Sequence, residues 1–74
     1  MSGSVDRLVS MANDIANFFH SEPDRAAAVD GVANHLKRFW DPRMRRKIVA
    51  HLAEHRGEGL SELARAAVAK LAAS

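Results

Sequence analysis

The stretch VANHLKRFWDPRMRRKIVAHL, residues 32–52, carries two apolar patterns of helical spacing on either side of Asp41-Pro42. On both sides, apolar residues recur at intervals of three and four residues, which is typical of one helix face. Aspartate is a favoured helix N-cap and proline a favoured first helical residue, so this pair predicts a sharp turn between two helices. We expect the two helices to span residues 23–40 and 42–56.

The same apolar spacing continues outward from this stretch and predicts one further helix on each side. The first is expected over residues 5–20, with Ser4 as its N-cap, and the last over residues 60–72, with Ser61 or Gly59 as its N-cap.

Proline and glycine mark the remaining boundaries. Pro23 is expected in the first turn of the helix over 23–40, where a missing N–H costs nothing. Gly57-Glu58-Gly59 is typical of the end of a helix. Gly31 is the exception, because it lies inside a predicted helix on its polar side. A glycine there costs about 1 kcal/mol relative to alanine, and the pattern gives no reason for it.

Four amphipathic helices with short connections predict an all-α fold, a small compact antiparallel helical arrangement in a single domain over residues 1–74. A chain of this length buries only about 60% of the surface that it exposes when unfolded, so its core is thin. Because the chain has no cysteine, disulfides cannot stabilise it, and we expect a partner chain to do so.

Charge and hydropathy indicate the compartment. The N-terminus lacks a basic run followed by an apolar block, and no apolar run approaches the roughly 18 residues that a membrane span needs. We therefore expect a soluble, cytoplasmic protein with no membrane contact. The net charge of +2 and the pI of 9.7 do not by themselves indicate nucleic acid.

The chain contains histidines and serines, which are common in active sites, but their spacing does not match that of a metal site or a catalytic site. His51 and His55 lie four apart, as metal ligands on one helix face do, but no third ligand is evident. Leu52 stands where a zinc protease needs glutamate. We expect these histidines, with His20 and His35, to lie on the surface. The serines fall at helix starts or polar positions, so we expect no catalytic residue, no metal and no bound cofactor.

The densest charge lies around the central turn. Six of the eleven basic residues fall within eleven positions: Lys37, Arg38, Arg43, Arg45, Arg46 and Lys47. Basic groups in the first turn of a helix oppose its dipole, so helix stability does not explain them. We expect an external partner for this cluster.

Two kinds of partner fit a basic cluster. Nucleic acid is one, because clustered cations contact phosphates. At about 100° per residue, however, Arg45, Arg46 and Lys47 point in different directions and form no single ridge. Arg45 points toward apolar neighbours, which suits a guanidinium bound to a carboxylate or to backbone carbonyls at a protein interface. We expect a protein partner and no nucleic acid, with a small basic helical nucleic-acid-binding or regulatory protein as the alternative.

Two aromatic residues precede the turn. Phe39 and Trp40 lie on opposite edges of one apolar face and cannot both occupy a narrow seam, so at least one closes the core. Trp, Phe, Met and Arg are enriched at protein interfaces. The residues that we expect to bind a partner are Phe39, Trp40, Arg43, Met44, Arg45 and Arg46. The wide apolar face of the first helix, extended by Met11 and Phe18, gives a further alternative, a helical protein that associates with itself through this face.

Three stretches carry a family likeness: LVSMANDIANFF at residues 8–19, VANHLKRFWDPRMR at residues 32–45 and GEGL at residues 57–60. Together they resemble the small delta subunit of NAD-dependent formate dehydrogenases. This resemblance implies an accessory subunit, for assembly or stability, in a cytoplasmic complex that oxidises formate and reduces NAD. The molybdenum cofactor, iron–sulfur clusters and FMN are then expected in the other subunits, which would be its protein partners. The resemblance assigns no catalytic residue to this chain.

Overall fold

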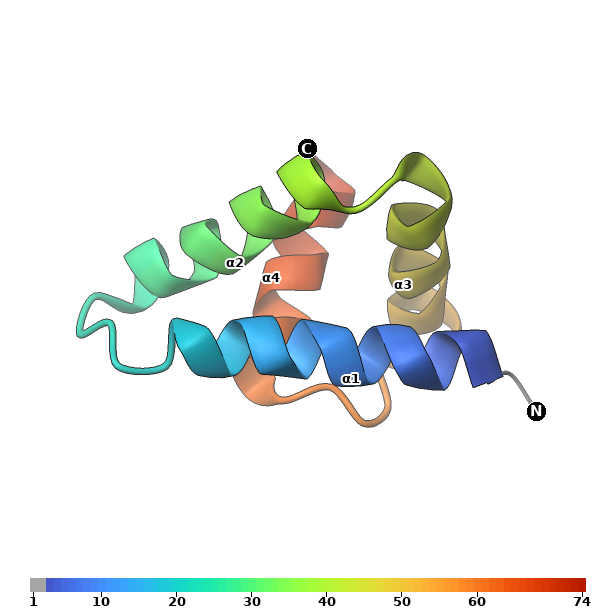
Figure 1. The fold of residues 1–74 in the computed structure, drawn as a ribbon, viewed down its shortest axis with the longest axis horizontal. Helices are drawn as coiled ribbons and strands as arrows, with labels where there is room; N and C mark the ends of the chain where they lie inside the picture. The colour runs from blue at the N-terminus through green and yellow to red at the C-terminus, as the bar shows by residue number, and fades with distance from the viewer. Residues whose placement is uncertain (1–2) are drawn as a thin grey trace.

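The computed structural model describes residues 3–74 and contains four helices (Figure 1). They are α1 (Gly3–Phe18), α2 (Arg25–Phe39), α3 (Pro42–His55) and α4 (Glu62–Ala73). The predicted all-α fold is confirmed, and the ends of each helix differ from the predicted ends by at most two residues. Residues 3–74 contain no strand.

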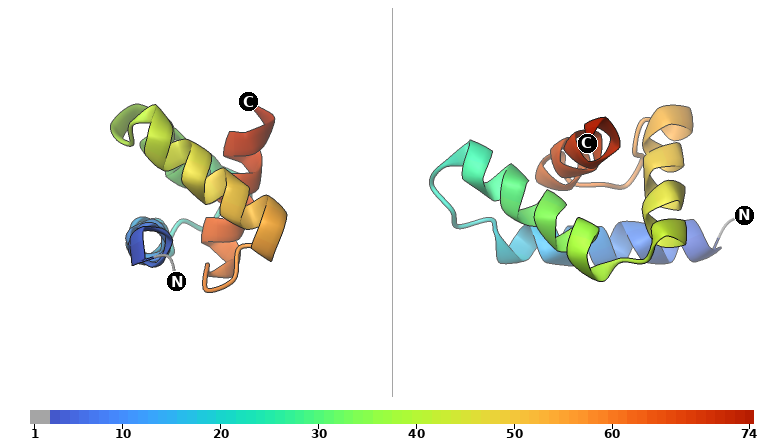
Figure 2. Two further views of the ribbon diagram at one scale, coloured as in Figure 1. Left: turned by 90° about the vertical axis from the view of Figure 1, so that its right-hand side faces the viewer. Right: turned by 90° about the horizontal axis from the view of Figure 1, so that it is seen from above.

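The helices pack without sharing one bundle axis. α1 and α2 run in opposite directions, whereas α3 stands steeply across α1 (Figures 1 and 2). α4 packs against the other three helices, most extensively against α2, while α2 and α3 form no comparable interface with each other. The radius of gyration is 11.1 Å, about the value expected of a compact chain of this length. α4 is therefore the element that holds the domain together.

Two aspartates begin the middle helices. Asp41 accepts a hydrogen bond from the Met44 N–H at 2.9 Å, and Pro42 is the first helical residue, as predicted. Asp24 does the same for α2, with a bond from the Ala26 N–H at 3.0 Å. The predicted place of Pro23 in the first turn of this helix is therefore wrong, because the proline precedes the cap.

The outer helices differ in how well their starts were predicted. Ser61 is the N-cap of α4, since its Oγ accepts a hydrogen bond from the Ala64 N–H at 3.2 Å. α1 begins at Gly3, so Ser4 lies inside its first turn and is not the predicted cap. The end of α3 follows the prediction, because Gly57 adopts a φ of 68°, a left-handed conformation that glycine tolerates without strain.

The core lies where α2, α3 and α4 meet over α1. Its largest fully buried side chains are Leu36, Ile48, Val32 and Val68. Alanines fill much of the remaining interior, and small side chains allow helix backbones to approach closely. Trp40 is only 5% exposed and closes this core at the end of α2.

Gly31 has a packing role that its position on the helical wheel concealed. The ring of Phe19 lies against its backbone, so closely that a Cβ at Gly31 would lie 2.5 Å from Cε1 of the ring. Phe19 in turn packs against the buried core. The prediction that this glycine faces the polar side is wrong, because the position is half-buried beneath the ring.

Candidate functional site

The junction between α2 and α3 is held by Arg45. Its Nη1 donates hydrogen bonds to the carbonyl oxygens of Lys37, at 2.7 Å, and Trp40, at 2.8 Å. The last carbonyls of a helix lack partners within it, so this guanidinium caps α2. The sequence predicted that Arg45 would bind carbonyls or a carboxylate at an interface. The carbonyls that it binds belong to this chain.

Phe39 and Trp40 go to opposite environments. Trp40 belongs to the core, whereas 68% of Phe39 is exposed to solvent. The exposed ring lies tilted by 39° against that of His35, with 4.7 Å between ring centroids, and the Arg38 guanidinium lies 5.8 Å from its centroid. The expectation that one of the two aromatics closes the core is confirmed. His35 is half-buried beside the ring of Phe39, while His20 is exposed as predicted.

Five of the six residues of the basic cluster line two separate grooves. Lys37, Arg45 and Arg46 line a groove of about 710 Å³ between α3 and α4, at the end of α2. Arg43 and Lys47 instead line a hollow of about 260 Å³ between α1 and α3, where the half-buried Met44 also lies. The predicted divergence of these cations is confirmed, because consecutive residues of the first turns of α3 face different sides of the helix.

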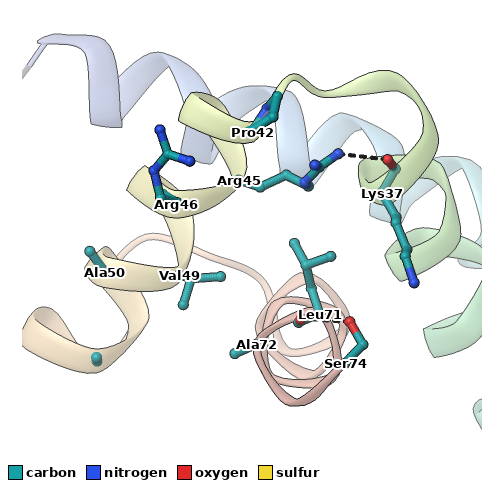
Figure 3. A pocket seen from close by; sticks show the side chains of 10 residues that line it. Lys37, Pro42, Arg45, Arg46, Val49, Ala50, Leu71, Ala72 and Ser74 are labelled. Atoms are coloured by element: carbon teal, nitrogen blue, oxygen red, sulfur yellow. Dashed lines mark hydrogen bonds between the residues drawn. The ribbon is translucent and has the colours of Figure 1, made fainter.

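We call the larger of the two the α3/α4 groove (Figure 3). It is lined by Lys37, Pro42, Arg45, Arg46, Val49, Ala50, Ala53, Leu71, Ala72 and Ser74. Leu71 extends from α4 toward the α2–α3 junction, and Val49 extends from α3 toward α4 (Figure 3). The groove thus combines an apolar floor with cations at one end, and none of its lining residues has an acidic side chain.

Two ion pairs lie away from the three arginines of α3. Arg25 pairs with Glu62 at 3.4 Å, and Lys70 pairs with Asp30 at 2.5 Å. In residues 3–74, no carboxylate lies within ion-pair distance of Arg43, Arg45 or Arg46. No carboxylate of residues 3–74 therefore neutralises the charge of these arginines by direct contact.

The histidine pair of α3 is not the surface pair that the sequence predicted. His51 is buried, at 8% exposure, and its Nε2 lies 2.8 Å from the carbonyl oxygen of Glu58. His55 is exposed, with its ring centroid 5.7 Å from that of His51. His51 thus ties the end of α3 to the loop that follows. Across residues 3–74, no group of three or more His, Cys, Asp or Glu side chains is arranged to hold a metal ion.

Asn13 has a structural role that the sequence did not reveal. Its Nδ2 donates to the Gly59 carbonyl at 2.9 Å, and its Oδ1 accepts from the Ser61 N–H at 2.8 Å. One amide of α1 therefore fixes the loop between α3 and α4. Periodicity placed this residue on the polar face of its helix, and no local pattern identifies a partner that lies 46 to 48 residues away.

These features define a small all-α protein with a groove between α3 and α4 that has an apolar floor and cations at one end. None of its described helices is long and apolar enough to cross a membrane. The family model described as NADH-dependent formate dehydrogenase delta subunit FdsD matches residues 7–68. Because the match covers most of the 74 residues, the chain belongs to this family, and the resemblance of its sequence is confirmed. Neither a curated protein nor a solved structure matches the chain.

Proposed function

We propose that this chain is a non-catalytic accessory subunit of a cytoplasmic NAD-dependent formate dehydrogenase. It binds the subunits that carry the molybdenum cofactor, the iron–sulfur clusters and FMN, and it promotes assembly or stability of the complex. The observation that carries the proposal is the family match over residues 7–68, since the family is that of the delta subunit.

The surface supports a role in protein contact. Arginines 43, 45 and 46 have no carboxylate partner among the described residues, and Phe39 exposes most of its ring. Exposed aromatic and arginine side chains are enriched at protein interfaces. A thin core without disulfides also gains stability when a partner binds the folded state.

The six predicted partner-binding residues divide by accessibility. Phe39, Arg43 and Arg46 are exposed and can contact a partner directly, whereas Met44 and Arg45 are half-buried. Trp40 is buried and would support the surface from beneath. Partner binding by these residues, and self-association of the isolated chain through the 82% exposed Phe18, remain predictions.

Co-purification tests the proposed function. The chain, tagged at its N-terminus so that the groove lined by Ser74 stays open, is expressed with the other formate dehydrogenase subunits and recovered at moderate salt. We expect the large subunits to be recovered with it, and we expect omission of the chain to lower the yield of intact, cofactor-loaded complex. Failure to recover any of these subunits, together with an unchanged yield in its absence, would contradict the proposal.

A further inference from the structure

We propose that the α3/α4 groove receives an amphipathic segment of a partner subunit, with apolar side chains on the groove floor and carboxylates beside Lys37, Arg45 and Arg46. The inference rests on the proposed function, because that function supplies a protein partner. It goes further by naming the surface and the chemistry of the segment that covers it.

The shape of the groove suits a segment of secondary structure. Val49 and Leu71 provide apolar surface from two helices, and between them the side chains are short, as at Ala50, Ala53 and Ala72. Small side chains let an incoming backbone approach closely, and an amphipathic helix commonly binds in an apolar groove between two helices. At about 710 Å³, this groove is more than twice the volume of the hollow between α1 and α3.

The charge of the groove specifies the polar half of its occupant. Lys37 and Arg46 are exposed, and neither makes an ion pair with a carboxylate of residues 3–74. Both hydrogen bonds of Arg45 use Nη1, so Nε and Nη2 of its five-donor fork have no acceptor among residues 3–74. The two carbonyls also hold this guanidinium in place, which lowers the entropic cost of binding a carboxylate.

Nucleic acid fits this surface less well than an acidic protein segment. A phosphate backbone is charged along its whole length, whereas the cations occupy one end of the groove and the floor is apolar. Of the other three cations of the cluster, Arg43 and Lys47 line the other hollow and Arg38 lines neither, so they do not extend the same track. The groove therefore matches a segment that is apolar along most of its length and acidic at one end.

Site-specific photo-crosslinking identifies the occupant. Ala53→p-benzoylphenylalanine places the probe at an exposed position of the groove, and Ser10→p-benzoylphenylalanine places it at an exposed position of α1 outside the groove. Each tagged variant is expressed with the other subunits and irradiated in the assembled complex, and crosslinked peptides are sequenced by mass spectrometry. We expect position 53, and not position 10, to crosslink to one apolar segment that contains Asp or Glu.

The possible outcomes separate the inference from the proposed function. Co-purification with no crosslink from position 53 would overturn the groove assignment while leaving the proposed function intact, as would a crosslink to nucleic acid, to a second copy of this chain or to a segment without carboxylates. If the position 53 variant alone fails to co-purify, the probe has blocked the groove, which supports the assignment. If the wild-type chain fails to recover the large subunits, that result would count against the proposed function itself.

Reversing the charge of the groove's cations tests their contribution to partner binding independently of the crosslinking. We expect the double variant Lys37→Glu/Arg46→Glu to lower recovery of the large subunits at least tenfold, and Arg56→Glu, at an exposed arginine outside the groove, to leave it unchanged. Reversing the carboxylates of the crosslinked segment to lysine should restore recovery of the double variant. Wild-type recovery by the double variant would overturn the inference, provided that its circular dichroism matches that of the wild type.

Discussion

The ring of Phe19 lies so close to the backbone of Gly31 that an added Cβ would be 2.5 Å from ring atom Cε1. Gly31→Ala should therefore destabilise the fold by about 1–3 kcal/mol, because the ring has to leave its place against the core. In an isolated helix the same substitution would instead stabilise the helical state by about 1 kcal/mol. Urea unfolding measures the change, and Asn34→Ala, at an exposed position of α2, is the control.

A double-mutant cycle isolates the cause of this effect. In a Phe19→Ala background the obstacle is absent, so Gly31→Ala should be neutral or stabilising. A loss of equal size in both backgrounds would show that the ring is not the reason for glycine at this position.

Because Arg45 makes two hydrogen bonds, we expect the free energy of unfolding to fall when its side chain is shortened or changed. We expect Arg45→Ala to destabilise the isolated chain by about 1–2 kcal/mol, because two carbonyls at the end of α2 lose a charged donor. Arg45→Lys should recover only part of this loss, since an ammonium lacks the planar fork. Arg46→Ala, one residue away and exposed, should change stability by less than about 0.5 kcal/mol. Thermal unfolding followed by circular dichroism would contradict the assignment if Arg45 and Arg46 behaved alike.

Asn13 predicts coupling between α1 and a distant loop. Asn13→Ala removes one donor and one acceptor from the loop at Gly59 and Ser61, and we expect a loss of about 1–2 kcal/mol. Hydrogen exchange should also accelerate at the Ser61 amide, which loses its acceptor. Asn17→Ala, at an exposed position of the same helix, is the matched control, and equal exchange in both variants would contradict this role.

Truncation of Trp40 should lower the stability of the chain, whereas truncation of Phe39 should weaken partner binding. Trp40→Ala is expected to unfold much of the isolated chain, because truncating a buried aromatic costs about 3–5 kcal/mol. Phe39→Ser should leave the unfolding midpoint nearly unchanged while it lowers recovery of the partner subunits. Recovery and melting temperature, measured on the same preparations, separate these outcomes. A Phe39→Ser variant that binds normally would remove this side chain from the proposed interface.

The helices and the central turn were predictable because their signals are local. Asp41 and Pro42 act within one helical turn, and apolar spacing reports which face of a helix is buried. The same spacing was enough to predict that Arg45 and Arg46 point to different sides of α3. The sequence also restricted the core at the end of α2 to Phe39 or Trp40, but the choice between them depended on how α2 crosses α4.

The contacts that escaped prediction join residues whose proximity depends on tertiary packing. Gly31 appeared to face solvent because nothing in its own helix places the ring of Phe19 above it. His51 appeared to lie on the surface because the chain reversal after Gly57, which brings the Glu58 carbonyl onto its ring, cannot be read from a helical wheel. The α3/α4 groove likewise arises from the crossing of two helices, so only its cations were visible in the sequence.

The corner between α2 and α3 is joined by one turn and the bonds of Arg45, without a helix–helix interface of its own. A segment seated in the α3/α4 groove would touch both sides of this corner and add a second link across it. Assembled copies would then open less often than surplus copies, because a ligand that binds only the folded state stabilises it. Proteases that cleave transiently open chains would remove the surplus first. Synthesis of this chain would not have to match that of its partners, since degradation would correct the excess.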